Sequence, residues 1–387
     1  MNVLIVCEFG NLNGAERSLL STVDNLRSDV IYTAVVPRSG ELASAFQQRN
    51  IPVYYLDWKL CDKNRPIEDL RKDFHAILQQ YKSDIAVTNH SNDVFLVHAN
   101  SLSSSKMAGP VCQSLNLPSL GHIRDIIRVS KQTIRDLNCN SRLACVSQAV
   151  KDYHLEQGLD SQKTVVLYNG VDLSTFYPNP TDENNKILKI GTSGQISLRK
   201  GMDIFLKSAL ILESRGVKLR YEIAGSRQSN KEETVELERK LTTSASQFPE
   251  NRFRLLGQLP ELSSWLQTLD IYVHTARQEP LGRVLLEVAA CGKPVVATDV
   301  GGTREIFCCH DKKNHDKNQY SALLVKPNDA TAVADAIETI IFNPDLKKEM
   351  GILSREIAQQ KFSIQTASKN LLNLYRELAA PIESNLD

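Results

Sequence analysis

Two carboxylates and the glycine between them are the residues of this chain whose types and spacing could do chemistry. Glu279 and Glu287 flank Gly282, and apolar residues before and after them predict strands that end at His274 and Ala297. The residues after Gly282 predict an amphipathic helix, whose N-terminal amides favour an anion. Carboxylates beside such amides suit the hydroxyl groups of a sugar or ribose better than a second phosphate. The stretch therefore predicts a nucleotide-sugar site.

Residues at the ends of other expected strands could serve the same site. Arg199 and Lys200 follow the strand that starts at Ile187, and a lysine there can reach a phosphate as a point charge. Gly14 lies in a loop between the first strand and the first helix, where a backbone can approach phosphate or sugar closely. His122 ends a further strand, where ligand sites of α/β sheets gather.

Two weaker candidates point to the binding of an acceptor. Arg124 follows His122 in the same loop and could recognise a polar or anionic group. Asn89 opens a polar run after a strand expected at 85–88, and polar loop residues at strand ends often bind ligands.

Clustered cysteines and histidines near residue 310 do not predict a metal site. Cys308, Cys309 and His310 are adjacent and His315 follows, a spacing that matches no zinc-ligand pattern. We expect a non-catalytic loop there and no metal ion.

The length and composition are those of an ordinary soluble globular protein. The 387 residues predict about two domains, 42% hydrophobic and 24% charged residues are typical of soluble proteins, and a net charge of +1 gives no case for nucleic acid. The eight cysteines lie mostly in apolar segments, which predicts free thiols in a reducing compartment. Without a leader peptide or an apolar run of ~20 residues, we expect a cytoplasmic protein, with peripheral contact at the inner face of a membrane left open.

Alternating strands and helices must position the candidate residues. The apolar run from Asn2 to Phe9 predicts a buried parallel strand, and the alternation after it predicts an α/β fold with doubly wound parallel sheets. Further strands are expected near 30–36, 53–56, 85–88, 119–123, 143–146, 164–167, 187–194, 221–224, 253–256, 271–274, 295–297 and 322–325.

A polar segment with two prolines, residues 176–185, is the best candidate for a linker. It predicts an N-terminal domain of residues 1–180 and a second domain of residues 187–363. Two helices, 346–361 and 364–379, are expected to end the chain. Two such α/β halves usually bind ligand in the crevice between them, at the carboxyl ends of the strands.

The order of these motifs resembles the retaining GT-B glycosyltransferases of the large family 4, the glycosyl transferases group 1. The resemblance covers almost the whole chain, and the joint order of the motifs is highly specific although each alone is weak. The motifs are Asn13-Gly14-Ala15-Glu16, GHIRD with His122, ACVSQAV with Ser147, YNGVD, Arg199-Lys200-Gly201, the pair Glu279 and Glu287, and GKPVVATDVGG.

The resemblance implies two Rossmann-like domains that face each other across a cleft, with the last helix, about 364–387, crossing back to the N-terminal domain. It also implies a hexosyltransferase-type enzyme, such as those of polysaccharide biosynthesis, that needs no metal or other cofactor. The sugar of a nucleotide-sugar donor, a UDP- or GDP-sugar, would pass with retention to a glycan, glycolipid or small-molecule acceptor.

The resemblance assigns roles to the residues around Gly282. Glu287 would accept hydrogen bonds from the ribose hydroxyls of the donor, and Glu279 would contact the sugar ring. The amides around Leu281, Gly282 and Arg283 would hold the diphosphate.

The remaining roles fall on the other loops. Lys200 would neutralise the leaving diphosphate, His122 would contact the transferred sugar or the acceptor, and Gly14 would line the donor site. The family pattern has an arginine where this chain has Gln195. Either Arg199 supplies the missing charge, or the charge of the donor is neutralised in another way, or the activity is lower.

Two other classes of function stay open at this stage. A GT-B sugar phosphorylase or a nucleotide-sugar epimerase would use a similar site, and a phosphorylase would need phosphate. A catalytically weak sugar-binding or scaffold protein is favoured only by Gln195, whereas Lys200, Glu279 and Glu287 argue for an enzyme.

Overall fold

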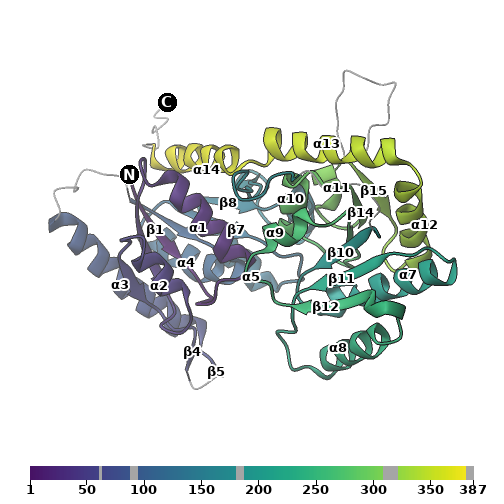
Figure 1. The fold of residues 1–387 in the computed structure, drawn as a ribbon. Coiled ribbons are helices and arrows are strands. Elements are labelled where there is room, and N and C mark those ends of the chain that lie inside the picture. Colours follow the sequence, from purple (N-terminus) through teal and green to yellow (C-terminus); the bar gives the residue numbers. More distant parts are fainter. Residues whose placement is uncertain (61–62, 88–94, 180–186, 308–320, 381–387) are drawn as a thin grey trace. The chain divides into compact units, whose positions relative to one another are not determined.

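The computed structural model describes residues 1–60, 63–87, 95–179, 187–307 and 321–380 of the chain. They form two compact units, one of Met1–Gly170 with Ile364–Asp387 and the other of Val171–Ser363 (Figure 1). Each unit is a parallel sheet flanked by helices, so the expected α/β class with two Rossmann-like domains is confirmed. No helix in the described ranges is long and apolar enough to cross a membrane.

The sheet of the first unit has seven strands, which lie in the order β3-β2-β1-β6-β7-β8-β9. Neighbouring strands pair in parallel, and β1 is buried along its whole length, as a continuous apolar run requires. The strands are β1 Asn2–Val6, β2 Ile31–Val36, β3 Val53–Tyr55, β6 Phe95–Ala99, β7 Ser119–Ile123, β8 Arg142–Cys145 and β9 Thr164–Val166.

Helices from both ends of the chain cover the first sheet. One core joins the sheet to α1, α2 and α14, and another joins it to α3 and α4. In Figure 1 the last helix, α14 in yellow, lies beside α1, so the expectation that it returns to the N-terminal domain is confirmed. The helices are α1 Gly14–Leu26, α2 Leu42–Gln47, α3 Ile67–Val87, α4 Leu102–Ser114, α5 Lys131–Asn138, α6 Gln148–Leu155 and α14 Ile364–Ala379, and β4 Lys59–Leu60 pairs with β5 Lys63–Asn64.

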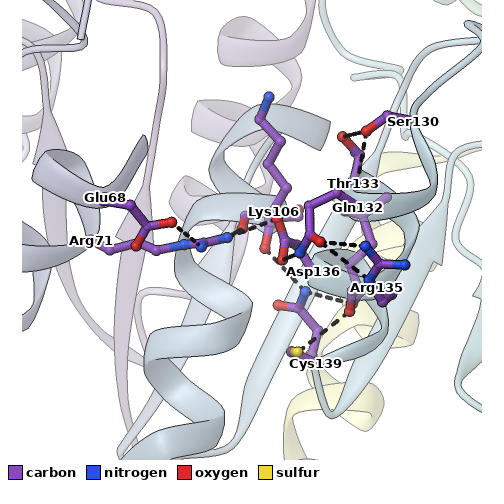
Figure 2. A network of polar contacts seen from close by, with 12 residues as sticks. Glu68, Arg71, Lys106, Ser130, Gln132, Thr133, Arg135, Asp136 and Cys139 are labelled. Atoms are coloured by element: carbon purple, nitrogen blue, oxygen red, sulfur yellow. Dashed lines mark hydrogen bonds and ion pairs between the residues drawn. The ribbon is translucent and has the colours of Figure 1, made fainter. Parts of the chain in front are cut away.

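A charged network fastens α3, α4 and α5 of this unit together. The guanidinium of Arg71 on α3 lies 2.8 Å from a carboxylate oxygen of Asp136 on α5 and donates to the carbonyl of Lys106 on α4 (Figure 2). Gln132 also donates to Asp136, at 2.8 Å. None of the candidate site residues that the structure describes takes part in these contacts, so we infer that the network stabilises the packing of the three helices.

The second unit has six parallel strands in the order β12-β11-β10-β13-β14-β15. Helices α7, α8 and α12 share one core with β10 and β11, and α10 contacts α11 and α13. The elements are β10 Lys189–Ser193, η1 Leu198–Lys200, α7 Met202–Ser214, β11 Arg220–Ala224, α8 Glu232–Ala245, η2 Pro249–Asn251, β12 Phe253–Gly257, α9 Leu262–Gln267, β13 Ile271–His274, α10 Arg283–Ala290, β14 Val295–Thr298, α11 Thr303–Phe307, β15 Ala322–Val325, α12 Ala330–Ile341 and α13 Pro344–Lys361.

Each sheet has one place where the strand order reverses, between β1 and β6 in the first unit and between β10 and β13 in the second. Loops leaving the carboxyl ends of the two strands at such a point separate to opposite faces, and ligands bind in the space between them. Lys200 follows β10 and Glu279 follows β13, so the topology of one sheet brings these two predicted residues together.

One predicted strand is wrong. Residues 85–87 continue α3, and the strand that pairs with β1 on the side away from β2 is β6, which the sequence did not predict. The apolar residue Ile85 belongs to the buried stripe of the helix, because with Leu78 and Tyr81 it recurs at helical spacing and packs on the same core. Asn89 lies outside the described residues, as do Cys308, Cys309, His310 and His315.

The division between the units falls between Gly170 and Val171, ahead of the segment 176–185 expected as a linker. Residues 171–179 therefore belong to the second unit, and residues 180–186 lie outside the described ranges. In the described part of the chain, the cysteines at positions 7, 112, 139, 145 and 291 carry free thiols.

Candidate functional site

The second unit brings Lys200 and Glu279 into direct contact. Lys200 ends the short helix η1 after β10, and Glu279 lies in the loop between β13 and α10. The ammonium nitrogen Nζ of Lys200 is 2.5 Å from Oε2 of Glu279, and both side chains are largely buried. Two charges from different loops thus meet at the carboxyl edge of the sheet, where a bound diphosphate and sugar were predicted.

A glycine allows the Lys200 loop to lie against the Glu279 loop. Gly201 has φ +68°, and a Cβ on it would lie only 1.8 Å from the carbonyl oxygen of Thr275. The hydroxyl of Thr275 donates a 2.7 Å hydrogen bond to the carbonyl of Gly201. A residue with a side chain would meet both a backbone clash and a strained left-handed conformation there.

Arg277, which the sequence did not single out, fastens the same two loops. Its guanidinium makes two hydrogen bonds to Asp203, at 2.8 and 2.7 Å, and a third to the carbonyl of Leu198. Its amide donates to the carbonyl of Arg199 at 2.8 Å. Such two-pronged arginine–carboxylate contacts hold geometry well, so Arg277 sets the position of the segment that carries Lys200.

Glu279 is held as a carboxylate. Burial by itself raises the pKa of this group, but Lys200 and then the ring of His274 outweigh burial and keep the pKa well below its ordinary range. Nε2 of His274 lies 3.1 Å from the same carboxylate oxygen as Lys200, and burial lowers the pKa of the histidine. An ionised Glu279 accepts hydrogen bonds but cannot serve as a general acid.

The start of α10 carries the second predicted carboxylate. Gly282 precedes the helix with φ +97°, Arg283 is its first residue and Glu287 lies one turn later. Nε of Arg283 is 2.9 Å from Oε1 of Glu287, whose side chain is buried, and Leu281 is buried beside them. The amide of Gly302 donates at 3.0 Å to the carbonyl of Glu279, which joins this loop to the one after β14.

Gln195, at the expected arginine position, and Arg199, four residues later, differ in their surroundings. Gln195 lies in the turn after β10 and is partly exposed, whereas Arg199 is exposed and donates at 3.2 Å to the carbonyl of Gln278. The carbonyl of Gln278 directly precedes Glu279 in the chain. Arg199 is therefore a second cation, besides Lys200, that lies close to the backbone of Glu279.

The first unit places His122 and Arg124 in a buried polar cluster at the end of β7. The guanidinium of Arg124 donates to the carbonyl and to Oδ1 of Asn100, at 3.0 and 2.8 Å, and to Oδ1 of Asn169 at 2.8 Å. It also lies 3.0 Å from Nδ1 of His122. Arg124 thus holds protein groups in place, and its predicted contact with an acceptor stays a prediction.

Two residues that the sequence did not predict complete the cluster. Nδ1 of His98 is 2.6 Å from the hydroxyl of Tyr375, and Nε2 of His98 is 3.4 Å from Nδ1 of His122. Burial, followed by Arg124, lowers the pKa of His98 to about 3 and lowers that of His122 well below its usual value. Both imidazoles are therefore neutral near pH 7.

Three buried polar atoms at this edge lack a protein partner among the described residues. They are Nδ2 of Asn100, Nε2 of His122 and Oε2 of Glu16. Burial raises the pKa of Glu16. Buried polar atoms normally have hydrogen-bond partners, so the two nitrogens and the carboxyl group are suited to hydroxyl groups of a ligand.

Gly14 begins α1 at the same edge of the first unit. A Cβ placed on Gly14 would meet no atom within 4 Å. Packing within the protein therefore does not require a glycine at this position, and the predicted close approach of a ligand would be a reason for one.

Two family models match adjoining parts of the chain. The model described as Glycosyltransferase Family 4 matches residues 12–175, and the model described as Glycosyl transferases group 1 matches residues 174–356. Together they extend from residue 12 to residue 356, so one family accounts for both units.

Relatives of known name are similar over part of the chain. A D-inositol 3-phosphate glycosyltransferase of Pseudarthrobacter chlorophenolicus is 32% identical over 229 residues, which cover 55% of this chain and 50% of that protein. An alpha-maltose-1-phosphate synthase of Mycolicibacterium smegmatis is 27% identical over 252 residues, which cover 61% of this chain and 62% of that protein. The similarity thus spans 50% and 62% of the length of these two relatives.

Solved structures share the fold of the whole chain. HepE of Anabaena, solved in complex with UDP, superposes with a TM-score of 0.77 at 22% identity, covering 97% of this chain and 100% of its own. Sucrose-phosphate synthase of Thermosynechococcus elongatus gives a TM-score of 0.73 at 18% identity, covering 98% and 99%. At these identities the similarity shows the fold alone.

Proposed function

Since the chain belongs to the GT-B glycosyltransferases of family 4, we propose that it transfers a sugar from a nucleotide-sugar donor to a hydroxyl of an acceptor, with retention at the anomeric carbon. The donor would be a UDP- or GDP-sugar, and the acceptor a glycan, a glycolipid or a small molecule. The UDP and UDP-glucose bound in the structures of Anabaena HepE support this class of donor.

The contact between Lys200 and Glu279 is the observation that carries the proposal. The carboxylate of Glu279 lies 2.5 Å from the ammonium group of Lys200 and compensates its largely buried charge. The diphosphate of a donor would offer Lys200 a second anion, and Glu279 would then be available to accept hydrogen bonds from sugar hydroxyls. A matched pair of charges of this kind suits a ligand with both a diphosphate and a sugar.

The chemical step follows from the same charges. The bond between the anomeric carbon and the phosphate oxygen breaks, and the electron pair passes to the diphosphate. Lys200, with Arg199, would stabilise that charge, and groups placed for this task before the reaction begins are among the strongest contributors to catalysis. The oxygen of the acceptor hydroxyl would form the new bond to the anomeric carbon on the face that the diphosphate leaves, and its proton would pass to the leaving phosphate oxygen. Glu279 is a poor base for that proton, because its contacts with Lys200 and His274 keep its pKa well below the ordinary range.

Glu287 would bind the donor without taking part in bond breaking. It is buried at the start of α10, and its Oε1 already lies 2.9 Å from Arg283. A carboxylate fixed in this way can accept hydrogen bonds from both hydroxyls of a ribose. We assign no step to a metal ion, since the proposed neutralisation of the diphosphate uses Lys200 and Arg199.

The polar cluster of the first unit would contact the sugar or the acceptor. Its unpaired groups, from Asn100, His122 and Glu16, can both donate and accept hydrogen bonds, as hydroxyl groups require. The free thiols of the described cysteines support a reaction in a reducing compartment.

A panel of UDP- and GDP-sugars tests the proposal. Each donor is incubated with the protein and a mixture of candidate acceptors, with and without EDTA, and release of nucleoside diphosphate is measured together with the anomeric configuration of the product. Diphosphate release that requires an acceptor, with a retained configuration, is expected. Sugar isomerisation without acceptor would indicate an epimerase, cleavage that depends on phosphate a phosphorylase, and tight binding without turnover a sugar-binding protein.

A further inference from the structure

A buried series of hydrogen bonds runs from a tyrosine of the C-terminal helix through His98 to His122, whose Nε2 has no partner among the described residues. The hydroxyl of Tyr375, on α14, lies 2.6 Å from Nδ1 of His98, and Nε2 of His98 lies 3.4 Å from Nδ1 of His122. The planes of the two imidazoles are inclined by 20° to each other, and the ring centroids are 5.6 Å apart. All three side chains are almost fully buried and belong to the first unit, so water does not compete for these contacts.

Arg124 determines which nitrogen of His122 carries the proton. A guanidinium has donors only, and Nη2 of Arg124 lies 3.0 Å from Nδ1 of His122, so Nδ1 must accept. Burial together with Arg124 lowers the pKa of the histidine, so the ring is neutral and holds a single proton. That proton is therefore on Nε2, the nitrogen that has no protein partner among the described residues.

The tautomer of His98 follows from its two neighbours. With its proton on Nδ1, the ring would direct the lone pair of Nε2 at the lone pair of Nδ1 of His122, 3.4 Å away. With its proton on Nε2, the ring donates to His122 and accepts at Nδ1 from the hydroxyl of Tyr375. The second arrangement avoids the two facing lone pairs and gives the hydroxyl of Tyr375 an acceptor in His98, so we assign the proton of His98 to Nε2.

We propose that Tyr375 is a positioning residue, which acts through His98 to hold His122 in the orientation and tautomer that present Nε2–H as a hydrogen-bond donor to a ligand hydroxyl. The choice of a sugar or a sugar-bearing acceptor as the ligand rests on the proposed function. The positions of the protons on His98 and His122 follow from contacts within the protein and do not depend on the proposed function.

Through Tyr375, α14 would help to position a ligand-binding side chain in addition to packing on the sheet. Leu371 and Leu374 of the helix enter the hydrophobic core of the first unit, which any apolar residue of similar size could do. A phenylalanine at position 375 would fill the same space as the tyrosine but would leave Nδ1 of His98 buried without a donor. Because buried acceptors without partners are unfavourable, His98 would then populate both tautomers and its support of His122 would weaken.

Nitrogen-15 NMR of the full chain, labelled at histidine and free of substrate, shows directly which ring nitrogens of His98 and His122 carry a proton. Protonated and unprotonated ring nitrogens have distinct shifts and couplings, and the signals are assigned from their loss in His98→Gln and His122→Asn variants. We expect both histidines of the wild type to be neutral near pH 7 and protonated on Nε2. A proton on Nδ1 of either ring would overturn the proposal, whether or not any donor is turned over.

The Tyr375→Phe variant tests whether the hydroxyl of Tyr375 fixes the tautomer of His98, with Tyr81→Phe as a matched control. Tyr81 is a buried tyrosine of the same unit that packs in the separate core around α3, so its variant should leave the signals of both histidines unchanged. Tyr375→Phe should give His98 a mixture of tautomers and lower kcat/KM about tenfold, the size of one lost hydrogen bond. An unchanged His98 spectrum in this variant would contradict the proposal, and if the variant does not fold, the spectrum of the wild type still decides.

Discussion

Nζ of Lys200 and Oε2 of Glu279 lie 2.5 Å apart although the two residues are separated by 79 positions in the chain. They meet because the strands before them, β10 and β13, are the neighbours at which the strand order of the second sheet reverses. The pair is largely buried, and its ionised carboxylate also lies 3.1 Å from His274. A ligand that takes the ammonium group must therefore compete with a preformed ion pair.

Replacing Lys200 by alanine should lower kcat about a hundredfold, because a preplaced donor to the leaving group is lost. Stability should also fall, by about 3 kcal/mol, since Glu279 loses the charge that compensates its burial. Steady-state kinetics with the best donor and unfolding in urea measure the two effects. Lys207→Ala, which removes an exposed lysine on the adjacent helix α7, should change neither quantity.

The double variant Lys200→Met with Glu279→Gln separates the loss of catalysis from the loss of stability. It removes both charges, so it should be more stable than Lys200→Met alone while remaining inactive. If the single and double variants were equally stable, the contact would not compensate the burial of Glu279.

Replacing Glu287 by alanine should weaken donor binding with the fold preserved. The loss of hydrogen bonds to a charged acceptor corresponds to an increase in Kd of about tenfold to a hundredfold. Calorimetric titration with the donor and, separately, with the nucleoside diphosphate checks this. Both ligands should lose the same factor, because the ribose is common to them, and Glu349→Ala on the exposed face of α13 is the control.

The donor side could be predicted from the sequence because its signals are local. Glu279, Gly282 and Glu287 fall within nine positions of one another, and Lys200 ends a short motif after a strand. Topology places the loops at the carboxyl edge of a parallel sheet, and the alternation of strands and helices already indicated that topology.

The histidine cluster could not be predicted in the same way. His98 and Tyr375 are separated by 277 positions and meet only when α14 packs on the first sheet. The strand that carries His98, β6, was missed because the apolar residues just before it were assigned to a strand instead of the end of α3. Periodicity over three or four apolar residues does not separate these alternatives. Arg277 and Asp203 were missed because an ion pair between a loop and the first turn of a helix leaves no pattern in either segment.

Two glycines of the candidate site should respond differently to alanine. Gly201→Ala should lower the free energy of unfolding by about 2 kcal/mol or more, because φ is +68° and the new Cβ would meet the carbonyl of Thr275. Gly14→Ala should leave stability within about 0.5 kcal/mol of the wild type, because its Cβ would meet no atom within 4 Å.

Activity then separates the roles of the two glycines. Gly14→Ala should still lower kcat/KM, since the predicted ligand would approach its backbone closely. Unfolding in urea and kinetics on the same preparations measure both quantities. Full activity in Gly14→Ala would remove Gly14 from the site.

Arg199 should supply the charge that Gln195 does not. Arg199→Ala is expected to lower kcat about tenfold, as the loss of one partly solvated cation near the diphosphate predicts. Adding Gln195→Arg to this variant should restore most of the lost rate, because the family pattern has its arginine at that position. Kinetics of the single and double variants form the measurement, and an unchanged rate in Arg199→Ala would leave Lys200 as the sole proposed cation.

The buried histidines of the first unit should make it sensitive to mild acid. The pKa of His98 is about 3 in the folded protein, that of His122 is also well below 6.5, and both rings become ordinary histidines on unfolding. Between these values the unfolded chain binds protons that the folded chain does not, so stability falls as the pH decreases from 6.5. At pH 5 His98 alone should lower the free energy of unfolding by about 2 kcal/mol relative to neutral pH, and His122 should act in the same direction.

Urea unfolding of the wild type and of His98→Gln at pH 7 and pH 5 measures this contribution. The variant should be less stable at pH 7 because Tyr375 and His122 lose a partner, but its stability should fall less steeply with acid, since one titrating group is gone. His75→Gln on the exposed side of α3 should keep the slope of the wild type. Equal slopes in the wild type and His98→Gln would show that His98 takes up its proton in the folded state, which would contradict both its neutral form and the direction of its bond to Tyr375.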